Sequence, residues 1–368
     1  MLLFPQKDEK ATGTEQIFYI LSERESVIGK LGQMLRLAGF THVEPISKSL
    51  KGIKTLPLAA QARGIVIDVG NSLDPQEMIL AIKTLVPRGI WCCVVGDKDA
   101  ITLAQAYARH GLHYFYIDAE EDEFIQVVAA GNPIKKSRRA VNISVLGCKG
   151  GVGNTTIAYH LVNKIIQLRQ MPTLFIQGKS GSHDLDLLFD KRMNQELMPV
   201  NKHLDLMCPQ DGSLPQLKYE TTEKYNFVIY EETANSADKE QLRQIIEHSS
   251  CLILTLDRSM SSIRVARQMI EINESINRAQ RVPRRLLVCV SDSRPVSGDM
   301  LSVKDVQSLI DRKIDVVFPW QKSQLRASLF PLKQKVTPID TLTQRVLGAP
   351  ENTRSFKLRF KTGRTGEI

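Results

Sequence analysis

The stretch NISVLGCKGGVGNTTIAYHL, from Asn142 to Leu161, constrains the fold more than any other part of the chain. An apolar run leads into closely spaced glycines, and a helical pattern follows. A second apolar run, TLFI, comes after that helix. The order strand, glycine turn, helix, strand is typical of a phosphate-binding loop, in which backbone N–H groups and a helix N-terminus face an anion. The helix places these apolar residues on one side: Ile157, Leu161, Val162, Ile165 and Leu168.

The cation that normally follows the last glycine of such a loop is missing. The pattern G-x-x-x-x-G-K-[ST] requires lysine there, and this chain has Asn154. Asparagine donates a hydrogen bond but carries no charge. The glycines still permit anion-binding geometry, Thr155 stands where such loops place the hydroxyl that meets Mg²⁺, and Lys149 supplies a cation ahead of the glycines. We therefore predict weakened phosphate binding.

The first half of the chain alternates short apolar runs with amphipathic helical patterns. One such pattern, SVIGKLGQMLRLAGF, ends near Gly39. Strands that alternate with helices predict a parallel sheet covered on both faces. The segment GNPIKKSRRAVN then has the composition of a linker. The expected strands lie at residues 17–21, 42–46, 64–69, 90–95 and 113–117.

Composition narrows the class of protein. With 42% hydrophobic and 24% charged residues, the chain is typical of a globular protein, and its apolar runs are too short to cross a bilayer. The N-terminus turns charged before a signal-peptide core could form. The six cysteines lack metal-binding spacing. We expect a cytoplasmic protein whose contact with membranes is at most peripheral.

The net charge of +9 is concentrated in two short clusters. One lies between Lys135 and Arg139 and the other between Arg354 and Arg364. Basic clusters can attract nucleic acid or anionic lipid. Short ones are more typical of solvated linkers and tails, so nucleic acid is not expected as a partner.

The letters KGGVGNTT resemble the deviant Walker A motif of the ParA/MinD ATPases, KGGVGKTT, and keep seven of its eight positions. The resemblance implies that Lys149 reaches the phosphates of a partner subunit across a nucleotide-sandwich homodimer. It also implies that the slot of Asn154 held the lysine for the phosphates of its own subunit. The implied nucleotide-binding residues are Lys149, Gly150, Gly151, Val152, Gly153, Asn154, Thr155 and Thr156, with Thr155 also at the metal.

Other catalytic positions of the resembling family have changed as well. The D-x-D pattern of its switch is replaced by Gln177, Gly178 and Lys179. The strand YNFVIYEE offers Glu231 as the Walker B equivalent in place of aspartate, and Ser291 stands where an asparagine helps to hold the base. Losing one electrostatic group costs about 100- to 1000-fold in rate. We expect weak binding of ATP with Mg²⁺, little or no hydrolysis, and no catalytic residues.

Three further segments resemble the CpaE/TadZ branch of this family, which serves tight-adherence (Flp) pilus assembly. They are SGSHDLDLLFD (180–190), TLDRSMSSIRVARQMI (255–270) and VVFPWQKSQLRASLFPLKQKV (316–336). The resemblance implies a scaffold in foci, polar and beside the inner membrane. Its implied partners are a pilus or secretion ATPase and inner-membrane pilus assembly proteins. The alternative is an active ParA/MinD-type ATPase that partitions DNA or positions itself on the membrane.

That branch carries a receiver-like, flavodoxin-like N-terminal domain, which the first half of this chain matches in architecture only. Asp68 stands where a receiver places its phosphorylated aspartate. Only Glu23 lies near the slot of the acidic pair that holds Mg²⁺, and the last strand lacks the expected lysine. We therefore expect a docking domain that is not phosphorylated, and not a response regulator.

The sequence predicts four parts. They are an atypical receiver-like domain (1–131), a linker (132–141), a P-loop ParA/MinD-like domain with a mostly parallel sheet (142–345) and a basic tail (346–368). In the tail, Phe356, Leu358 and Phe360 alternate with basic residues. This alternation suits a β-strand added to a partner, while a disordered, solvated tail is the other interpretation. The tail could contact a membrane surface or a pilus ATPase.

Overall fold

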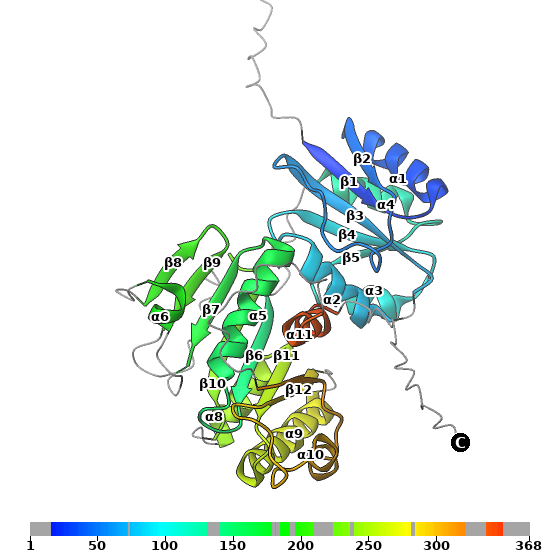
Figure 1. The fold of residues 1–368 in the computed structure, drawn as a ribbon. Helices are drawn as coiled ribbons and strands as arrows, with labels where there is room; N and C mark the ends of the chain where they lie inside the picture. Colours follow the sequence, from blue (N-terminus) through cyan, green and yellow to red (C-terminus); the bar gives the residue numbers. More distant parts are fainter. Residues whose placement is uncertain are drawn as a thin grey trace, which may run out of the picture.

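The computed structural model contains two separate β-sheets (Figure 1). One belongs to the first half of the chain and the other to the second half, so both halves are α/β as predicted. The structure describes residues 16–72, 74–130, 140–178, 181, 185–191, 196–208, 224–235, 239–280, 284–320 and 336–348.

The first sheet has five parallel strands in the order β2-β1-β3-β4-β5. This is the strand order of flavodoxin-like doubly wound folds. The five predicted apolar runs are confirmed as strands. No helix lies between β2 and β3, where residues 47–61 form turns and irregular backbone. The strands are β1 (Ile17–Leu21), β2 (His42–Ile46), β3 (Ala62–Gly70), β4 (Trp91–Gly96) and β5 (His113–Tyr116).

Helices cover both faces of this sheet because apolar residues point out of each face. The buried residues of α1 and α4 share one core cluster, and those of α2 and α3 share the other. Asp74 caps α2 by accepting hydrogen bonds from the backbone N–H groups of Gln76 and Glu77. The helices are α1 (Glu25–Leu37), α2 (Pro75–Leu85), α3 (Ile101–Ala108) and α4 (Glu121–Ala129).

The second sheet has eight strands in the order β13-β12-β11-β6-β10-β7-β9-β8. All neighbours are parallel except β8 and β9, which pair antiparallel at one edge. The prediction of a mostly parallel sheet is confirmed. The strands are β6 (Val141–Gly147), β7 (Thr173–Gln177), β8 (Leu197–Asn201), β9 (Leu204–Met207), β10 (Phe227–Thr233), β11 (Cys251–Leu256), β12 (Arg285–Ser291) and β13 (Val316–Phe318).

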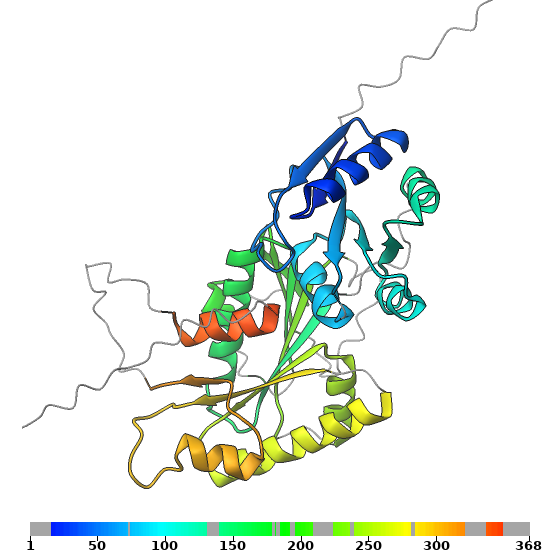
Figure 2. The ribbon, with the colours of Figure 1, turned by 90° about the vertical axis from the view of Figure 1, so that its right-hand side faces the viewer.

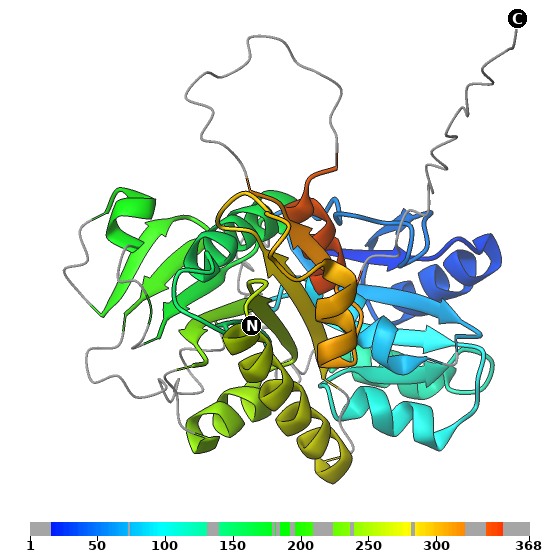
Figure 3. The same cartoon turned by 60° about the horizontal axis from the view of Figure 1, so that its bottom comes forward.

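Two groups of helices sandwich this sheet. Helices α5 and α11 pack on one face, side by side in Figure 2, and α8, α9 and α10 pack on the other (Figure 3). No helix among the described residues is long and apolar enough to span a membrane. The helices are α5 (Asn154–Arg169), α6 (Leu185–Phe189), α8 (Lys239–His248), α9 (Met260–Gln280), α10 (Val303–Ile310) and α11 (Pro338–Leu347).

The two halves touch through α2, α11 and the amino end of β10. Leu80 of α2 packs against the core beneath α11. Arg88 donates from Nη1 to the backbone oxygen of Tyr225 (2.9 Å), and Asn226 donates from Nδ2 to that of Val86 (3.3 Å). The first half therefore sits at the amino end of β10, away from the carboxyl ends of the parallel strands.

Two element boundaries differ slightly from the predicted domain limits. β6 begins at Val141, inside the expected linker, and α11 continues to Leu347, inside the expected tail. Apolar burial explains both, because Val141 and Leu347 belong to the same core. Most of the predicted linker, and the tail from residue 349, lie outside the described residues.

Candidate functional site: a phosphate-binding loop without its local cation

The glycine loop follows the central strand β6 at the carboxyl edge of the eight-stranded sheet. β6 lies between β10 and β11, and the next strand in the chain, β7, lies on the far side of β10. In open parallel sheets, ligands bind at the carboxyl ends of strands where the order reverses in this way. The topology therefore places the loop at the expected binding edge.

Two glycines give the loop a shape that other residues rarely adopt. Gly151 and Gly153 have φ angles of +76° and +78°, in the left-handed region. Val152, 2% exposed, anchors the loop between them. Helix α5 begins directly afterwards at Asn154, so its free N–H groups lie at the loop. Gly150 and Thr156 are exposed beside it.

Asn154, which replaces the lysine, points into the protein. Its side chain is 8% exposed. The amide Nδ2 donates to Glu231 Oε1 (2.9 Å) and to the backbone oxygens of Val145 and Glu232 (both 3.2 Å). The amide is thus bound to β6 and β10 and brings no charge to a phosphate.

Glu231, near the end of β10, is the carboxylate at the centre of this arrangement. It is 1% exposed, and its Oε1 also accepts a hydrogen bond from Thr155 Oγ1 (3.0 Å). Its Oε2 has no hydrogen-bond partner among the described residues. Burial raises the pKa of Glu231 above its ordinary value, although the hydrogen bonds from Asn154 and Thr155 partly offset this effect.

The Thr155–Glu231 pair fits a magnesium ion that arrives with a nucleotide. Mg²⁺ keeps several waters and is usually bound through one or two carboxylates plus substrate phosphates. Thr155 offers a hydroxyl, and Glu231 offers the oxygen that lacks a partner. No group of three or more His, Cys, Asp or Glu side chains able to hold a metal occurs in the described part of the chain. These residues could hold Mg²⁺ only together with phosphate oxygens and water.

Lys149 lies at the opposite end of the loop, in a half-exposed ion pair. Its Nζ is 3.2 Å from Asp257 Oδ2 and 3.3 Å from Ser259 Oγ, and the lysine side chain is 43% exposed. Burial raises the pKa of Asp257, but hydrogen bonds from Ser259 and the ammonium of Lys149 outweigh it, so this pKa lies below its ordinary value. The one cation of the glycine loop is therefore neutralised by its own chain.

Sequence reasoning missed a second ion pair beside the loop. Arg258 donates from Nε and Nη2 to Asp292 at 2.6 and 3.0 Å, and the two side chains are only 8% and 3% exposed. Asp257 and Asp292 directly follow β11 and β12. Their positions after two apolar strand patterns could have predicted that both carboxylates lie at the carboxyl edge of the sheet. Ser291, the predicted base-side residue, lies here, and a Cβ on Gly153 would be 3.5 Å from its Oγ.

The three positions that match the acidic switch of the resembling family are Gln177, Gly178 and Lys179, and none of them is acidic. Gln177, at the end of β7, is 2% exposed, and its Oε1 lies 3.7 Å from the thiol of Cys208. Gly178 packs so tightly against Glu232 that any Cβ would clash. Lys179, most of segment 180–190 beyond its helix, and residues 321–335 of the predicted C-terminal segment lie outside the described residues.

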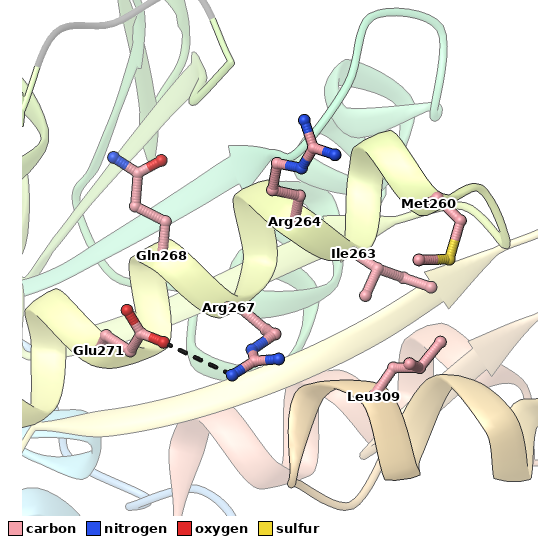
Figure 4. Close-up of a pocket in the computed structure, with 7 residues that line it drawn as sticks. All are labelled: Met260, Ile263, Arg264, Arg267, Gln268, Glu271 and Leu309. Carbon is pink, nitrogen blue, oxygen red and sulfur yellow. Dashed lines mark ion pairs between the residues drawn. The ribbon is translucent and has the colours of Figure 1, made fainter.

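A separate pocket of about 350 Å³ lies between α9 and α10 (Figure 4). Ile263, Met260 and Leu309 form its apolar part, and Arg264 and Arg267 lie beside them. Met260 follows Ser259, the contact of Lys149, so the pocket starts near that end of the glycine loop. Its helices cover the other face of the sheet from α5.

In the first half, Asp68 does not meet the residue that the sequence suggested. Glu23 is exposed, and Arg24 instead forms an ion pair with Asp68 at 2.6 Å. Arginine was overlooked because an acidic side chain was expected at that slot.

Comparisons with known proteins find similarity to solved structures only. No family model matches the chain, and no curated protein matches it. MinD from Aquifex aeolicus is 20% identical over 57% of this chain and 98% of that one, with a TM-score of 0.40. A ParA family ATPase from Chlorobium tepidum TLS is 15% identical (50% and 85% covered, TM-score 0.36), and an ATP complex of Cyanothece McdA is 16% identical (47% and 77%, TM-score 0.37). Because these identities lie at or below 20% and these TM-scores at or below 0.40, the evidence for the α/β class is the strand order of the two sheets.

Proposed function

We propose that this protein is a ParA/MinD-like dimeric scaffold that binds ATP and Mg²⁺ weakly and hydrolyses ATP little or not at all. The side chain of Asn154 is the observation that carries the proposal. It replaces the local phosphate cation, and its amide Nδ2 donates to Val145, Glu231 and Glu232, while its Oδ1 has no hydrogen-bond partner among the described residues. A loop of this kind can hold phosphate through backbone N–H groups, but it cannot neutralise developing charge locally.

The loss in binding follows from the strength of the bonds involved. Charge-assisted hydrogen bonds contribute about 1.5–3 kcal/mol, against about 1 kcal/mol for neutral ones. Removing the lysine therefore weakens phosphate binding without abolishing it. Hydrolysis suffers more, because a missing electrostatic group costs about 100- to 1000-fold in rate. Gln177 also puts a neutral amide at an acidic switch position.

Mg²⁺ would be held by Thr155 and Glu231 together with nucleotide phosphates. When bound, the ion would supply positive charge beside Glu231, the carboxylate whose Oε2 lacks a partner in the described chain. Thr155 would offer a lone pair of its hydroxyl oxygen while its O–H donates to Glu231, and Asn154 would keep the carboxylate in place.

Dimerisation is supported by the exposure of Lys149. The resembling family uses this lysine across a subunit boundary, and in this chain it is held by a half-exposed pair with Asp257 and by a contact with Ser259. Such pairs contribute about 0–1 kcal/mol, so Lys149 can leave Asp257 at low cost. Two chains that face each other through their glycine loops would place their N-terminal halves at the outer ends, because those halves sit at the amino end of β10.

The cellular role we propose is to position a tight-adherence (Flp) pilus assembly or secretion apparatus. The support is the resemblance of segments 180–190, 255–270 and 316–336 to the CpaE/TadZ branch. A dimer that assembles without cycling on ATP hydrolysis suits a stationary landmark, and two receiver-like domains would offer docking surfaces. We propose cytoplasmic foci, polar and beside the inner membrane, with a pilus or secretion ATPase and inner-membrane pilus proteins as partners.

The biochemical test measures binding and turnover separately. Titration of the purified protein with ATP and Mg²⁺ should give weak but saturable binding, and sedimentation should show a dimer at tens of micromolar protein. Phosphate release should be undetectable. Robust phosphate release that Thr155→Ala abolishes would show an active ATPase and overturn the proposal.

The cellular test separates the two functions that the family supports. Deleting the gene should scatter the pilus ATPase and abolish surface fibres, while plasmid and chromosome inheritance stays normal. Intact fibres with failed DNA segregation would favour the partition function instead.

A further inference from the structure

Two carboxylates meet at the carboxyl edge of the five-stranded sheet. Asp68 lies near the end of β3, and Asp97 directly follows β4. The backbone ties the two strand ends together, since Asp97 donates its N–H to the carbonyl of Gly70 (3.1 Å). The side chains of Asp68 and Asp97 are 5% and 20% exposed. Two acidic groups this close require a cation to stay charged together.

Arg24, three residues after the end of β1, supplies that cation. Its Nε and Nη2 donate to the two oxygens of Asp68 at 2.9 and 2.6 Å, and its Nη1 donates to Asp97 Oδ2 at 2.6 Å. One guanidinium therefore bridges two strands through a bidentate contact and a single one. These contacts raise the pKa of Arg24 above its ordinary value, with the Asp68 bond as the largest cause.

Asp68 is left with no free acceptor site. Besides the two bonds from Arg24, its Oδ2 accepts from Ser22 Oγ (2.6 Å) and its Oδ1 from the backbone N–H of Gly70 (2.8 Å). A carboxylate has about four lone-pair sites, and all four are used here. The carboxylate cannot bind a metal or attack a phosphoryl group unless Arg24 leaves.

The position of this cluster distinguishes it from an ordinary surface ion pair. In a sheet of order 2-1-3-4-5, the order reverses between β1 and β3, and ligands bind in the crevice at the carboxyl ends there. Arg24 follows β1, and Asp68 lies on β3, so the guanidinium occupies that crevice. The arginine side chain is 37% exposed, which places the contact at the mouth of the crevice.

We propose that Arg24 is a built-in cation that closes a latent divalent-cation site formed by Asp68 and Asp97. The N-terminal half then keeps one fixed conformation that responds neither to Mg²⁺ nor to phosphoryl donors. Because the cluster lies in the first sheet, this inference is independent of the proposed ATP site.

Removal of Arg24 should convert the closed site into a metal site. In the full-length, nucleotide-free protein, Arg24→Ala should bind Mn²⁺ about tenfold more tightly than the wild type does, because a positive charge leaves and two carboxylates remain. Its melting temperature should rise with added Mg²⁺. Lys30→Ala is the matched control: it removes the same charge from between two carboxylates, Glu121 and Asp118, but these are exposed to water, so cation binding should stay unchanged.

Two more variants keep the test decisive. Arg24→Gln retains hydrogen-bond donors without the charge and replaces Arg24→Ala if that variant does not fold. Adding Asp68→Asn should abolish the gained Mn²⁺ binding, which separates this site from Thr155 and Glu231. The proposal is overturned if neither Arg24 variant binds Mn²⁺ more tightly than Lys30→Ala, or if the wild type already has a cation site that Asp68→Asn removes.

Discussion

One carboxylate at the carboxyl edge of each sheet, Asp68 in the first and Glu231 in the second, has the opposite kind of surroundings. In the first sheet, Asp68 receives four hydrogen bonds, two of them from the guanidinium of Arg24. In the second, Glu231 is more deeply buried, yet its donors, Asn154 and Thr155 among them, are neutral, and one of its oxygens has no hydrogen-bond partner among the described residues. One edge is satisfied internally. The Glu231 site leaves one carboxylate oxygen open to a ligand.

The two edges are also separated in space. The first half contacts the second through α2 and the amino end of β10, whereas the glycine loop lies at the carboxyl end of β6. A nucleotide bound at the loop would therefore not touch the Arg24 cluster of the same chain. The first half is therefore not part of the candidate nucleotide site.

The largest expected effect comes from removing an arginine that pairs with a buried carboxylate at the carboxyl end of a strand. Arg258 and Asp292 repeat the Arg24–Asp68 arrangement in the second sheet, but with deeper burial. Arg258→Ala leaves Asp292 buried without its partner, and breaking such a pair costs about 3–5 kcal/mol. Urea unfolding should show a loss in free energy of unfolding of this size.

An exposed arginine provides the control for that measurement. Arg243 pairs with Glu247 on the surface of α8, so Arg243→Ala should change stability by about 0.5 kcal/mol or less. If Arg258→Ala and Arg243→Ala lost the same free energy of unfolding, burial would not determine how much such an ion pair stabilises the protein. The contrast drawn between Asp68 and Glu231 would then lose its physical basis.

The parts of the structure that depend on local sequence were predictable, and the pairings across the sheets were not. Apolar runs located the five strands of the first sheet, and the spacing of Ile157, Leu161 and Ile165 located the buried side of α5. The contact of Arg24 with Asp97 joins residues 73 positions apart and depends on strand order, which the sequence does not state. The same reason hid Arg258 and Asp292.

The antiparallel edge strand β8 and the irregular segment between β2 and β3 were also beyond prediction. β8 reads LMPVN, with a proline and mixed polarity, and so lacks the uniform apolar pattern of a buried strand. The identity of Asn154 was plain from the sequence. Its inward orientation was not, because it depends on Glu231 from a strand 77 residues away.

A second prediction gives Glu231 the kind of partner that Asp68 already has. Asn154→Lys places an ammonium where the amide now lies and restores a charge-assisted contact to phosphate. ATP affinity should rise by about 1–2 kcal/mol, roughly 5- to 30-fold, as measured by calorimetry. Hydrolysis should stay near background, since Gln177 remains. Asn154→Gln is the neutral control and should bind no more tightly than the wild type.

A third prediction uses the pH dependence of stability. Because the pKa of Glu231 is raised, the folded protein holds this proton to a higher pH than the unfolded chain does. Its free energy of unfolding should therefore fall as the pH rises from 4.5 through the raised pKa, by about 1.4 kcal/mol for each pH unit between the two values. Glu231→Gln should flatten the curve, whereas the exposed Glu274→Gln should not. An unchanged slope in Glu231→Gln would contradict the raised pKa of Glu231.

The smallest expected effect concerns Lys149, the one cation that the glycine loop retains. Asp257→Asn removes its charged partner, but the lysine is 43% exposed, so water replaces the lost contact well. The free energy of unfolding should change by less than about 1 kcal/mol, and added salt should reduce even that difference. A loss of several kcal/mol would mean that Lys149 is fixed within its own chain as firmly as Arg24 is. The second edge would then be closed as well, because no mobile cation would remain to reach a phosphate on a partner subunit. A small loss in free energy of unfolding would show that Lys149 can leave Asp257 easily. Lys149 would then differ from Arg24, which is held firmly by Asp68 and Asp97.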